Sequence, residues 1–526
     1  MNQISIISEI QSFLEGKNTD LKYLVNVETD SRDRFATCII HDPVKGKLTE
    51  KIEFYPFLYI KDLKKEGYRL FNGNEMKRNA IIKKYGISIK KLKTANHSRL
   101  ENGYPYIVKT TGAFENIINF FKEAGLDPYD KMRDENDRIL YGNNGIPISK
   151  HRHLFYIPKL KEQFFISTGI RLFKGFEDYN DIHKLTFDIE TTGLRYEHSR
   201  IFAIGIKDNR GFEYVIEGKS DDLDKSERRI IQDFFKIIHI LKPAVISGYN
   251  SENFDFEFIL KRAELLGVDL SKMITTLHDE KKITRVDSTV KFGGNTERYK
   301  KTNAYGYTIL DIIHAVKKTA AVNSEIKNNK LKYICQFENI AKPNRMYING
   351  DEIGRFWNEN PIFLLNKVNN NYVEIPSEYN SIGIELYSLQ EKKENISDDE
   401  YNENKKSILD GNDEFIKWLN KKFKELFKEV GDPRKDFRFE CGKNILRRYL
   451  LDDLWETEQV DNLYNQSSFL LAKIVPTDYG RVATMGNAAV WNLLMTAWSY
   501  DNDLAIPHPD DIEHFSGGLA RCFKKG

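Results

Sequence analysis

An apolar segment that carries two acids constrains the fold of this chain more than any other feature. The run KLTFDIETTGL at 184–194 has the apolar character of a buried strand, yet it includes Asp188 and Glu190. Because side chains alternate along a strand, these two residues lie on one face near its C-terminal end. Burying two like charges is costly unless a cation offsets them, and Mg²⁺ prefers oxygen ligands. The pair therefore fits a metal site, and it also fits capping or surface acids.

The residues that follow predict an α/β region. Two strands are expected within 201–217, a helix at 224–241, and a buried strand at 244–250. In the next segment, GYNSENFDFEFIL, Asp255 opens a predicted helix. An acid at this position is also favoured by the helix dipole alone, so it does not by itself indicate a site.

A second helix carries another candidate pair. In RRYLLDDLWET, Tyr449 and Asp453 are four residues apart, which places them on one helix face. An aromatic residue and an acid at this spacing also occur on ordinary amphipathic helices. The pair therefore indicates a functional site only in combination with the other acidic motifs and their order in the chain.

The N-terminal part predicts mainly strands. Strand-like alternation covers 20–60, and further strands are expected in 150–187, including EQFFISTGIRLF at 162–173. The tract 77–93 holds seven Lys or Arg residues and no acid. It is interpreted either as a solvated face or as a patch facing phosphates.

Composition excludes several classes of protein. The 526 residues include 80 basic and 78 acidic side chains, a net charge of +2, so any nucleic-acid-binding charge must be local. The four cysteines are far apart, which argues against a disulfide framework or structural zinc site. No apolar run approaches the roughly 18 residues that span a bilayer. We expect a soluble, cytoplasmic protein without a membrane partner.

Taken together, the three acidic motifs resemble a known family. DIE at 188–190, N-x-x-x-F-D at 250–255 and Y-x-x-x-D at 449–453 are similar to the Exo I, Exo II and Exo III motifs of B-family DNA polymerases. The flanking segments resemble bacteriophage members. No histidine lies four or five residues before Asp453, so the tyrosine (DEDDy) subtype is the better match.

The resemblance implies a proofreading 3′–5′ exonuclease that uses two Mg²⁺ or Mn²⁺ ions. Asp188 would bridge the ions, Glu190 and Asp453 would complete the first, and Asp255 would hold the second through water. Tyr449 would position the attacking water at the 3′-terminal phosphodiester of single-stranded DNA, releasing a nucleoside monophosphate. The implied fold is α/β, with a ribonuclease-H-like mixed sheet beside an α+β or β-rich N-terminal domain.

The resemblance also predicts DNA contacts. Lys281–Lys301 is expected to form a basic β-hairpin that turns at FGGN, where phage relatives carry a hairpin that passes the primer strand to the exonuclease. A plain surface hairpin has the same sequence pattern. The candidate DNA-binding residues are Asn250, Phe254, Lys291, Arg298 and Lys300.

The predicted domains are an N-terminal domain at 1–180, an exonuclease domain at 181–465 and a return segment at 466–526. An insertion is expected at about 355–437, and its charged stretch 388–407 is interpreted as mobile. The palm motifs D-x-x-S-L-Y-P and D-T-D-S are absent from the sequence. We therefore expect the palm, fingers and thumb to be missing or to lie on a separate polypeptide. The expected partners are that polypeptide, primer-template DNA and a sliding clamp.

Two other functions stay open at this point. The chain could be an assembly and DNA-binding module that docks a palm-containing subunit. It could also be a stand-alone nuclease of the same acidic class, although the long flanking segments argue against that.

Overall fold

The computed structural model describes residues 8, 11–16, 21–61, 75–93, 103–124, 133–140, 154–155, 157–218, 221–426 and 437–507. The chain divides into two compact units. The N-terminal unit comprises Met1–Lys174, Leu471–Asp478 and Asn487–Gly526, and the central unit comprises Gly175–Leu470 and Tyr479–Gly486. None of the described helices is both long and apolar enough to cross a bilayer.

The N-terminal unit contains two antiparallel sheets, with strand orders β1-β2-β3 and β5-β6-β4-β7. Its elements are β1 (Leu24–Glu28), β2 (Phe35–Asp42), β3 (Gly46–Glu53), β4 (Phe57–Ile60), α2 (Glu75–Tyr85), β5 (Ile87–Lys91), β6 (Tyr106–Thr110), α4 (Phe114–Glu123), β7 (Leu154–Phe155), α5 (Leu160–Thr168) and α17 (Asn487–Asp501). The strand predicted over EQFFISTGIRLF is wrong, because α5 occupies its first half. Gly169 ends this helix in the left-handed region, at φ 71°.

The central unit is built on a five-stranded mixed sheet with the order β10-β9-β8-β11-β14. Strand β11 runs parallel to β8 and β14, whereas β9 runs antiparallel to β8 and β10. This arrangement confirms the predicted α/β class. The strands are β8 (Lys184–Thr191), β9 (Ile201–Asp208), β10 (Glu213–Glu217), β11 (Val245–Gly248) and β14 (Thr308–Asp311).

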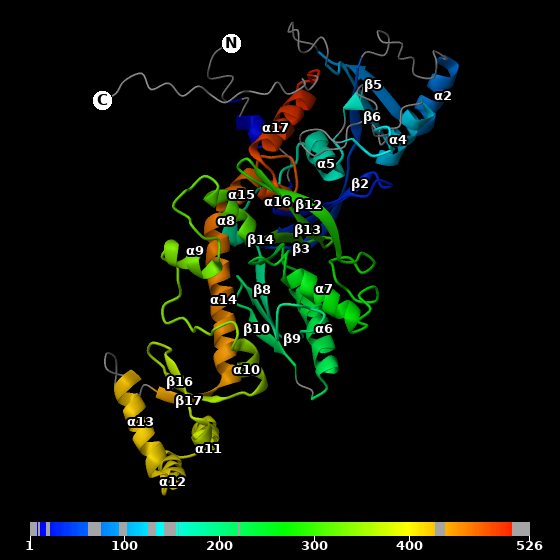
Figure 1. The fold of residues 1–526 in the computed structure, drawn as a ribbon. Helices are drawn as coiled ribbons and strands as arrows, with labels where there is room; N and C mark the ends of the chain where they lie inside the picture. The colour runs from blue at the N-terminus through cyan, green and yellow to red at the C-terminus, as the bar shows by residue number, and fades with distance from the viewer. Residues whose placement is uncertain are drawn as a thin grey trace, which may run out of the picture. The chain divides into compact units, whose positions relative to one another are not determined.

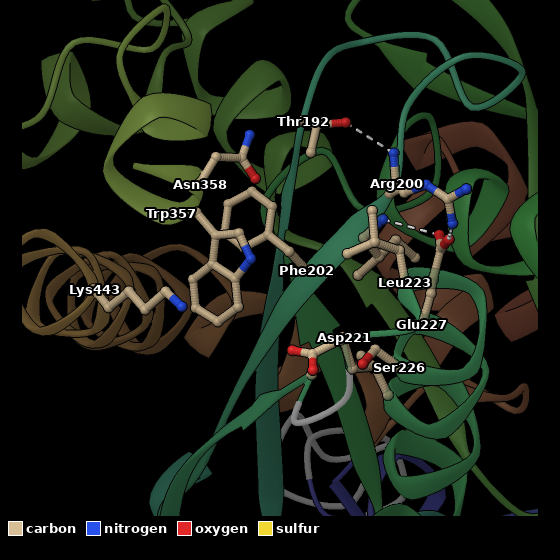
Figure 2. Close-up of a pocket in the computed structure, with 13 residues that line it drawn as sticks. Thr192, Arg200, Phe202, Asp221, Leu223, Ser226, Glu227, Trp357, Asn358 and Lys443 are labelled. Carbon is tan, nitrogen blue, oxygen red and sulfur yellow. Dashed lines mark hydrogen bonds and ion pairs between the residues drawn. The ribbon is translucent and has the colours of Figure 1, made fainter. Parts of the chain in front are cut away.

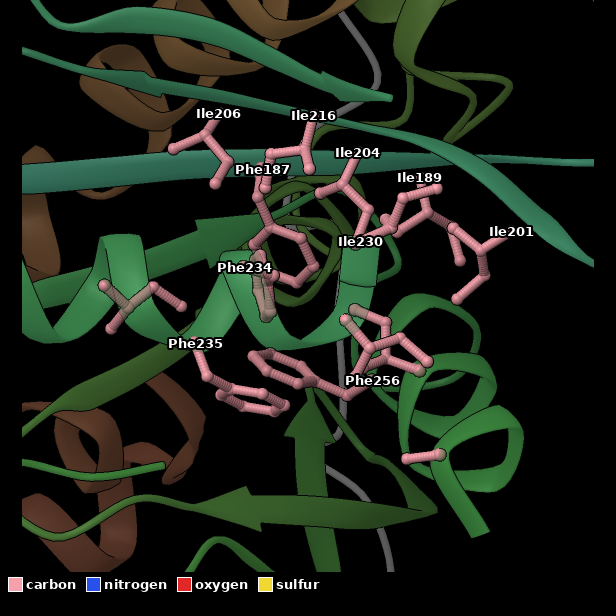
Figure 3. Packing of buried hydrophobic residues seen from close by; sticks show 14 of the residues in the cluster. Phe187, Ile189, Ile201, Ile204, Ile206, Ile216, Ile230, Phe234, Phe235 and Phe256 are labelled. Carbon is pink, nitrogen blue, oxygen red and sulfur yellow. The ribbon is translucent and has the colours of Figure 1, made fainter. Parts of the chain in front are cut away.

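Two helices cover one face of this sheet, α6 (Leu223–Leu241) and α7 (Asp255–Leu265). The apolar stripe of α6 packs against alternate residues of β8 and β9, as Figure 3 shows for Phe234 and Phe187, whose ring centroids lie 5.1 Å apart. This period-two pattern on the strands leaves the intervening residues, among them Asp188, to point to the opposite face.

The opposite face is covered by α14 (Gly442–Tyr464), a long helix that contacts β8, β9 and β10. Figure 1 shows α14 on one side of the sheet, with α6 and α7 on the other. The other described elements here are η2 (Tyr179–Asp181), α8 (Ile312–Ala320), α9 (Leu331–Phe337), α10 (Ile353–Asn358), α15 (Gln466–Ala472) and α16 (Tyr479–Thr484).

The basic hairpin is present as predicted. It consists of β12 (Thr284–Phe292) and β13 (Asn295–Asn303), paired from Phe292–Asn295 at the tip to Thr284–Asn303 at the base. Gly293 occupies the turn with a positive φ of 55°.

The segment between α10 and α14 forms a small layer with its own apolar cluster and a sheet ordered β16-β15-β17. The charged stretch 388–407, predicted to be mobile, is largely helical, because Ser397 caps a helix that begins with three acids. The elements are β15 (Ile362–Asn366), β16 (Tyr372–Glu374), η3 (Ser377–Tyr379), α11 (Asn380–Glu391), η4 (Lys393–Asn395), α12 (Asp398–Leu409), α13 (Asp413–Leu426) and β17 (Phe437–Cys441).

Candidate active site

Asp188 and Glu190 lie on the face of β8 that α14 covers. Asp188 pairs with Gly205 across the strands and Glu190 pairs with Ala203, so all four positions share this face. Glu190 is buried at 7% exposure, and Asp188 is partly exposed. The strand therefore places both carboxylates under the helix, as its alternation predicts.

Asp255 reaches the same region from a different element. Strand β11 ends at Gly248, a turn follows, and Asp255 is the first residue of α7. Its Oδ1 accepts a hydrogen bond from the Ile189 backbone N–H at 3.2 Å, between Asp188 and Glu190 in the sequence. Asp255 is 3% exposed, so this carboxylate is also buried.

Helix α14 contributes Tyr449 and Asp453, both buried. The helix can approach the sheet closely because Gly205 has no side chain. A Cβ at position 205 would lie 2.8 Å from side-chain carbons of both Leu450 and Leu454. A glycine on β9 thus sets how near α14 comes to the acids of β8.

The carboxylates perturb one another electrostatically. Burial, followed by the charge of Asp453, raises the pKa of Asp188 to about 7. Burial and then the charge of Asp188 raise the pKas of Glu190 and Asp255 well above their ordinary values. A raised pKa means that the surroundings disfavour the ionised carboxylates, and a bound cation would favour them.

Lys332, at the start of α9, is a site residue that the sequence interpretation missed. Its Nζ donates a hydrogen bond to the Tyr449 hydroxyl at 2.9 Å. Its charge acts to lower the pKas of Asp188 and Glu190, against the larger effect of burial. Lys332 lies outside the three acidic motifs, and no pattern in the sequence around it marks this lysine.

Arg345 was also missed, and it engages one of the candidate metal ligands. Its buried guanidinium forms ion pairs with Asp453 and with Glu456, one helical turn further along α14. Across the described ranges, no three His, Cys, Asp or Glu side chains lie close enough together to hold a metal ion. The oxygen donors fit a hard divalent cation chemically, but they do not form a completed ligand cage.

The predicted DNA-binding residues lie in two places. Asn250 occupies the turn before α7 with φ 63°, and Phe254 packs on Phe258 with ring centroids 5.4 Å apart. The other three residues are exposed on the hairpin, where Lys300 pairs with Asp287 at 2.7 Å; they are Lys291, Arg298 and Lys300.

A pocket of about 460 Å³ lies apart from the four carboxylates, none of which lines it. Figure 2 shows Trp357 against Phe202 in this pocket, with ring centroids 4.9 Å apart and nearly parallel planes. Lys443 lies over the Trp357 ring at 4.7 Å from its centroid. The pocket does not contain the acidic chemistry, so it does not define the candidate active site.

Comparisons with known proteins point to one family. Residues 214–334 match the family model described as "DNA polymerase family B, exonuclease domain", a segment that includes Asp255 and Lys332. DNA polymerase 1 of Pyrococcus abyssi is 37% identical over 117 residues, covering 21% of this chain and 15% of that protein. The DNA polymerase of Archaeoglobus fulgidus is 29% identical over 184 residues, covering 34% and 20%.

A solved structure extends the likeness in fold. The family B DNA polymerase of the archaeon Pyrobaculum calidifontis superposes with a TM-score of 0.52 at 14% identity, covering 93% of this chain. The chain spans about half of that structure, 51%, and smaller shares of the curated relatives. These relatives are archaeal, so the phage type stays a prediction. Residues 214–334 are thus similar to the exonuclease domain of DNA polymerase family B.

Proposed function

We propose that the central unit is a divalent-metal-dependent 3′–5′ DNA exonuclease that proofreads primer ends in replication. One observation carries this proposal: carboxylates of β8 and α7 lie close together beside Asp453 of α14, and burial followed by neighbouring charge raises the pKas of Asp188, Glu190 and Asp255. A structural role would not require acids from three elements to share one region in which only Asp453 has an ion-pair partner, Arg345.

Two Mg²⁺ or Mn²⁺ ions are the proposed cofactors, held by Asp188, Glu190, Asp255 and Asp453. When bound, such ions lower the pKa of a coordinated water and stabilise charge on the leaving oxygen of a phosphodiester. To bind a cation, Asp453 would have to break its ion pair with Arg345. Arg345 would then still pair with Glu456.

Tyr449 is proposed to orient water rather than to act as a base. Burial raises the pKa of its hydroxyl far above neutral, so the group stays protonated. Lys332 donates to the Tyr449 oxygen, and the hydroxyl also forms a hydrogen bond with Asp453. Its proton would turn from Asp453 toward water or phosphate once Asp453 binds a cation. This pair would fix the direction of attack on the 3′-terminal phosphate.

The proposed substrate is the single-stranded 3′ end of DNA at a primer-template junction. Asn250 and Phe254 would contact the terminal nucleotides, and Lys291, Arg298 and Lys300 would contact the strand from the exposed hairpin. The proposed protein partners are the palm, fingers and thumb regions of a family B polymerase and a sliding clamp. The proposed location is the cytoplasm.

The test uses the purified chain and a 5′-labelled single-stranded oligonucleotide with Mg²⁺ or Mn²⁺. We expect stepwise loss of 3′ nucleotides, release of nucleoside monophosphates, and no activity in chelator. The Asp188→Ala, Glu190→Ala double variant should lose at least about a thousandfold in rate. Equal rates for the wild type and a correctly folded double variant would contradict the proposal.

One observation favours a second candidate, an assembly module without nuclease activity. Arg345 already neutralises Asp453, and no three-ligand cluster is completed within the ranges described. This candidate predicts that Mn²⁺ neither binds nor activates the chain, although the chain still binds primer-template DNA.

A further inference from the structure

We propose that Glu252 is a positioning residue that couples the β12–β13 hairpin to the metal-ligand candidate Asp255. This inference rests on the proposed nuclease function, and it assigns the hairpin a mechanical connection to the catalytic site. The two residues lie in the same turn, with Glu252 three positions before Asp255.

The hairpin holds the Glu252 side chain from one side. The Thr302 backbone N–H donates to both carboxylate oxygens of Glu252, at 3.0 and 2.9 Å. The Thr302 Oγ1 donates to Oε2 at 2.5 Å. Glu252 is 2% exposed and Thr302 is 1% exposed, so water does not replace these bonds without local opening.

The opposite strand of the hairpin holds the Glu252 backbone. Arg285 is the cross-strand partner of Thr302, and its Nη2 donates to the Glu252 carbonyl oxygen. The same Nη2 donates to the Lys300 carbonyl at 3.0 Å, and Nη1 donates to Glu257 on α7 at 3.1 Å. One residue pair at the hairpin base therefore holds Glu252 and the first turn of the helix that begins with Asp255.

A second buried carboxylate fixes the other side of the turn. Asp311, at the end of β14, accepts the N–H groups of Asn250 at 2.8 Å and Glu252 at 3.0 Å. Asp311 also accepts a hydrogen bond from the backbone N–H of Ile313, in the first turn of α8, at 3.2 Å. The turn is therefore held at two points, at the end of β14 through Asp311 and at the hairpin base through Glu252.

The decisive experiment compares Thr302→Val with Thr289→Val. Both substitutions exchange a hydroxyl for a methyl group in the same hairpin, but Thr289 is exposed on β12 and has no role in the Glu252 contact. Thr302→Val removes only the Oγ1 donor, so the fold and the backbone bonds are retained.

Hydrogen exchange is measured for amides in 250–256, which does not require nuclease activity. Thr302→Val should accelerate their exchange by about tenfold or more, the effect of losing a hydrogen bond to a charged group. Thr289→Val should exchange like the wild type. Unchanged exchange in Thr302→Val would overturn the coupling, whether or not the chain is a nuclease.

Kinetics separate positioning from a purely structural role. Thr302→Val should lower kcat several-fold and raise the Mn²⁺ concentration needed for half-maximal rate, with the KM for single-stranded DNA unchanged. Glu252→Gln retains one acceptor and one donor toward Thr302 and should keep a near-wild-type kcat, whereas Glu252→Leu should lower kcat. The proposal would be contradicted if Thr302→Val changed only the KM for single-stranded DNA. It would also be contradicted if Glu252→Gln and Glu252→Leu had the same kcat. If the wild type removes no nucleotides, the proposed function fails while the exchange result still decides the coupling.

Discussion

Two groups of buried carboxylates lie in the central unit, and the protein treats them differently. Glu252 and Asp311 accept hydrogen bonds from backbone N–H groups and from a hydroxyl, which complete their shells. Glu190 has no hydrogen-bond donor among the residues that the structure describes. The first group is satisfied by its own chain. The proposed metal ligands are satisfied only in part, because Asp255 accepts one backbone N–H and Asp453 pairs with Arg345, whereas Glu190 is left for a cation or water. This contrast distinguishes acids that stabilise the fold from the acids proposed to bind metal.

The largest stability effect should come from the satisfied group. Asp311→Ala leaves three backbone N–H groups without their acceptor, so the free energy of unfolding should fall by about 3–5 kcal/mol. Urea denaturation measures the change. Asp287→Ala is the control, because this carboxylate is 88% exposed and should matter by about 0.5 kcal/mol or less. A small loss in Asp311→Ala would remove the distinction between the two groups.

The unsatisfied group should respond to metal. With Mn²⁺ at about one hundred times its dissociation constant, the wild type should gain about 2.7 kcal/mol in stability. Asp188→Asn should lose most of this gain, since it removes the proposed bridging ligand. Thermal unfolding with and without Mn²⁺ tests this expectation. A gain of the same size in Asp188→Asn would show that the cation binds elsewhere.

Tyr449→Phe should cost about ten- to a hundredfold in kcat, because the hydroxyl held by Lys332 is lost. The KM for DNA should change little. Tyr214→Phe, on the exposed edge strand β10, controls for loss of a tyrosine hydroxyl. Full activity in Tyr449→Phe would exclude a role for this hydroxyl in orienting water.

The smallest effect concerns pH in the presence of chelator. A folded pKa of about 7 for Asp188 lies above its unfolded value, so its contribution is present at low pH and is lost as pH rises through 7. Between pH 5 and 7 the wild type should lose about 1–2 kcal/mol more than Asp188→Asn. Burial also raises the pKa of Asp311 to about 7, and the difference between these two proteins cancels that contribution. The difference reports Asp188 together with its effect on the pKas of Glu190 and Asp255. Parallel pH profiles would contradict the assignment.

Local patterns predicted much of the fold. Alternation and helical spacing indicated the mixed α/β region, the hairpin, and the elements that carry Asp188, Glu190, Asp255, Tyr449 and Asp453. These features depend on neighbours in the sequence. The EQFFISTGIRLF segment was predicted wrongly because a short apolar run fits a strand and a buried helix equally well.

The rest of the candidate site depends on contacts between distant segments. Lys332 meets Tyr449 across 117 positions, and Arg345 meets Asp453 across 108. Neither residue has a distinctive local pattern, so only the folded chain identifies them. The roles of all the site residues remain predictions.

The absent side chain at Gly205 has a consequence for engineering. Gly205 lies opposite Asp188 and under α14. A single methyl group added there would push the helix away from the sheet, because it would contact Leu450 and Leu454. It would widen the gap between the acids of β8 and Asp453 without changing the charge of either. The distance between the proposed metal ligands of β8 and α14 thus depends on this packing contact, and Gly205→Ala would change that distance without removing a carboxylate.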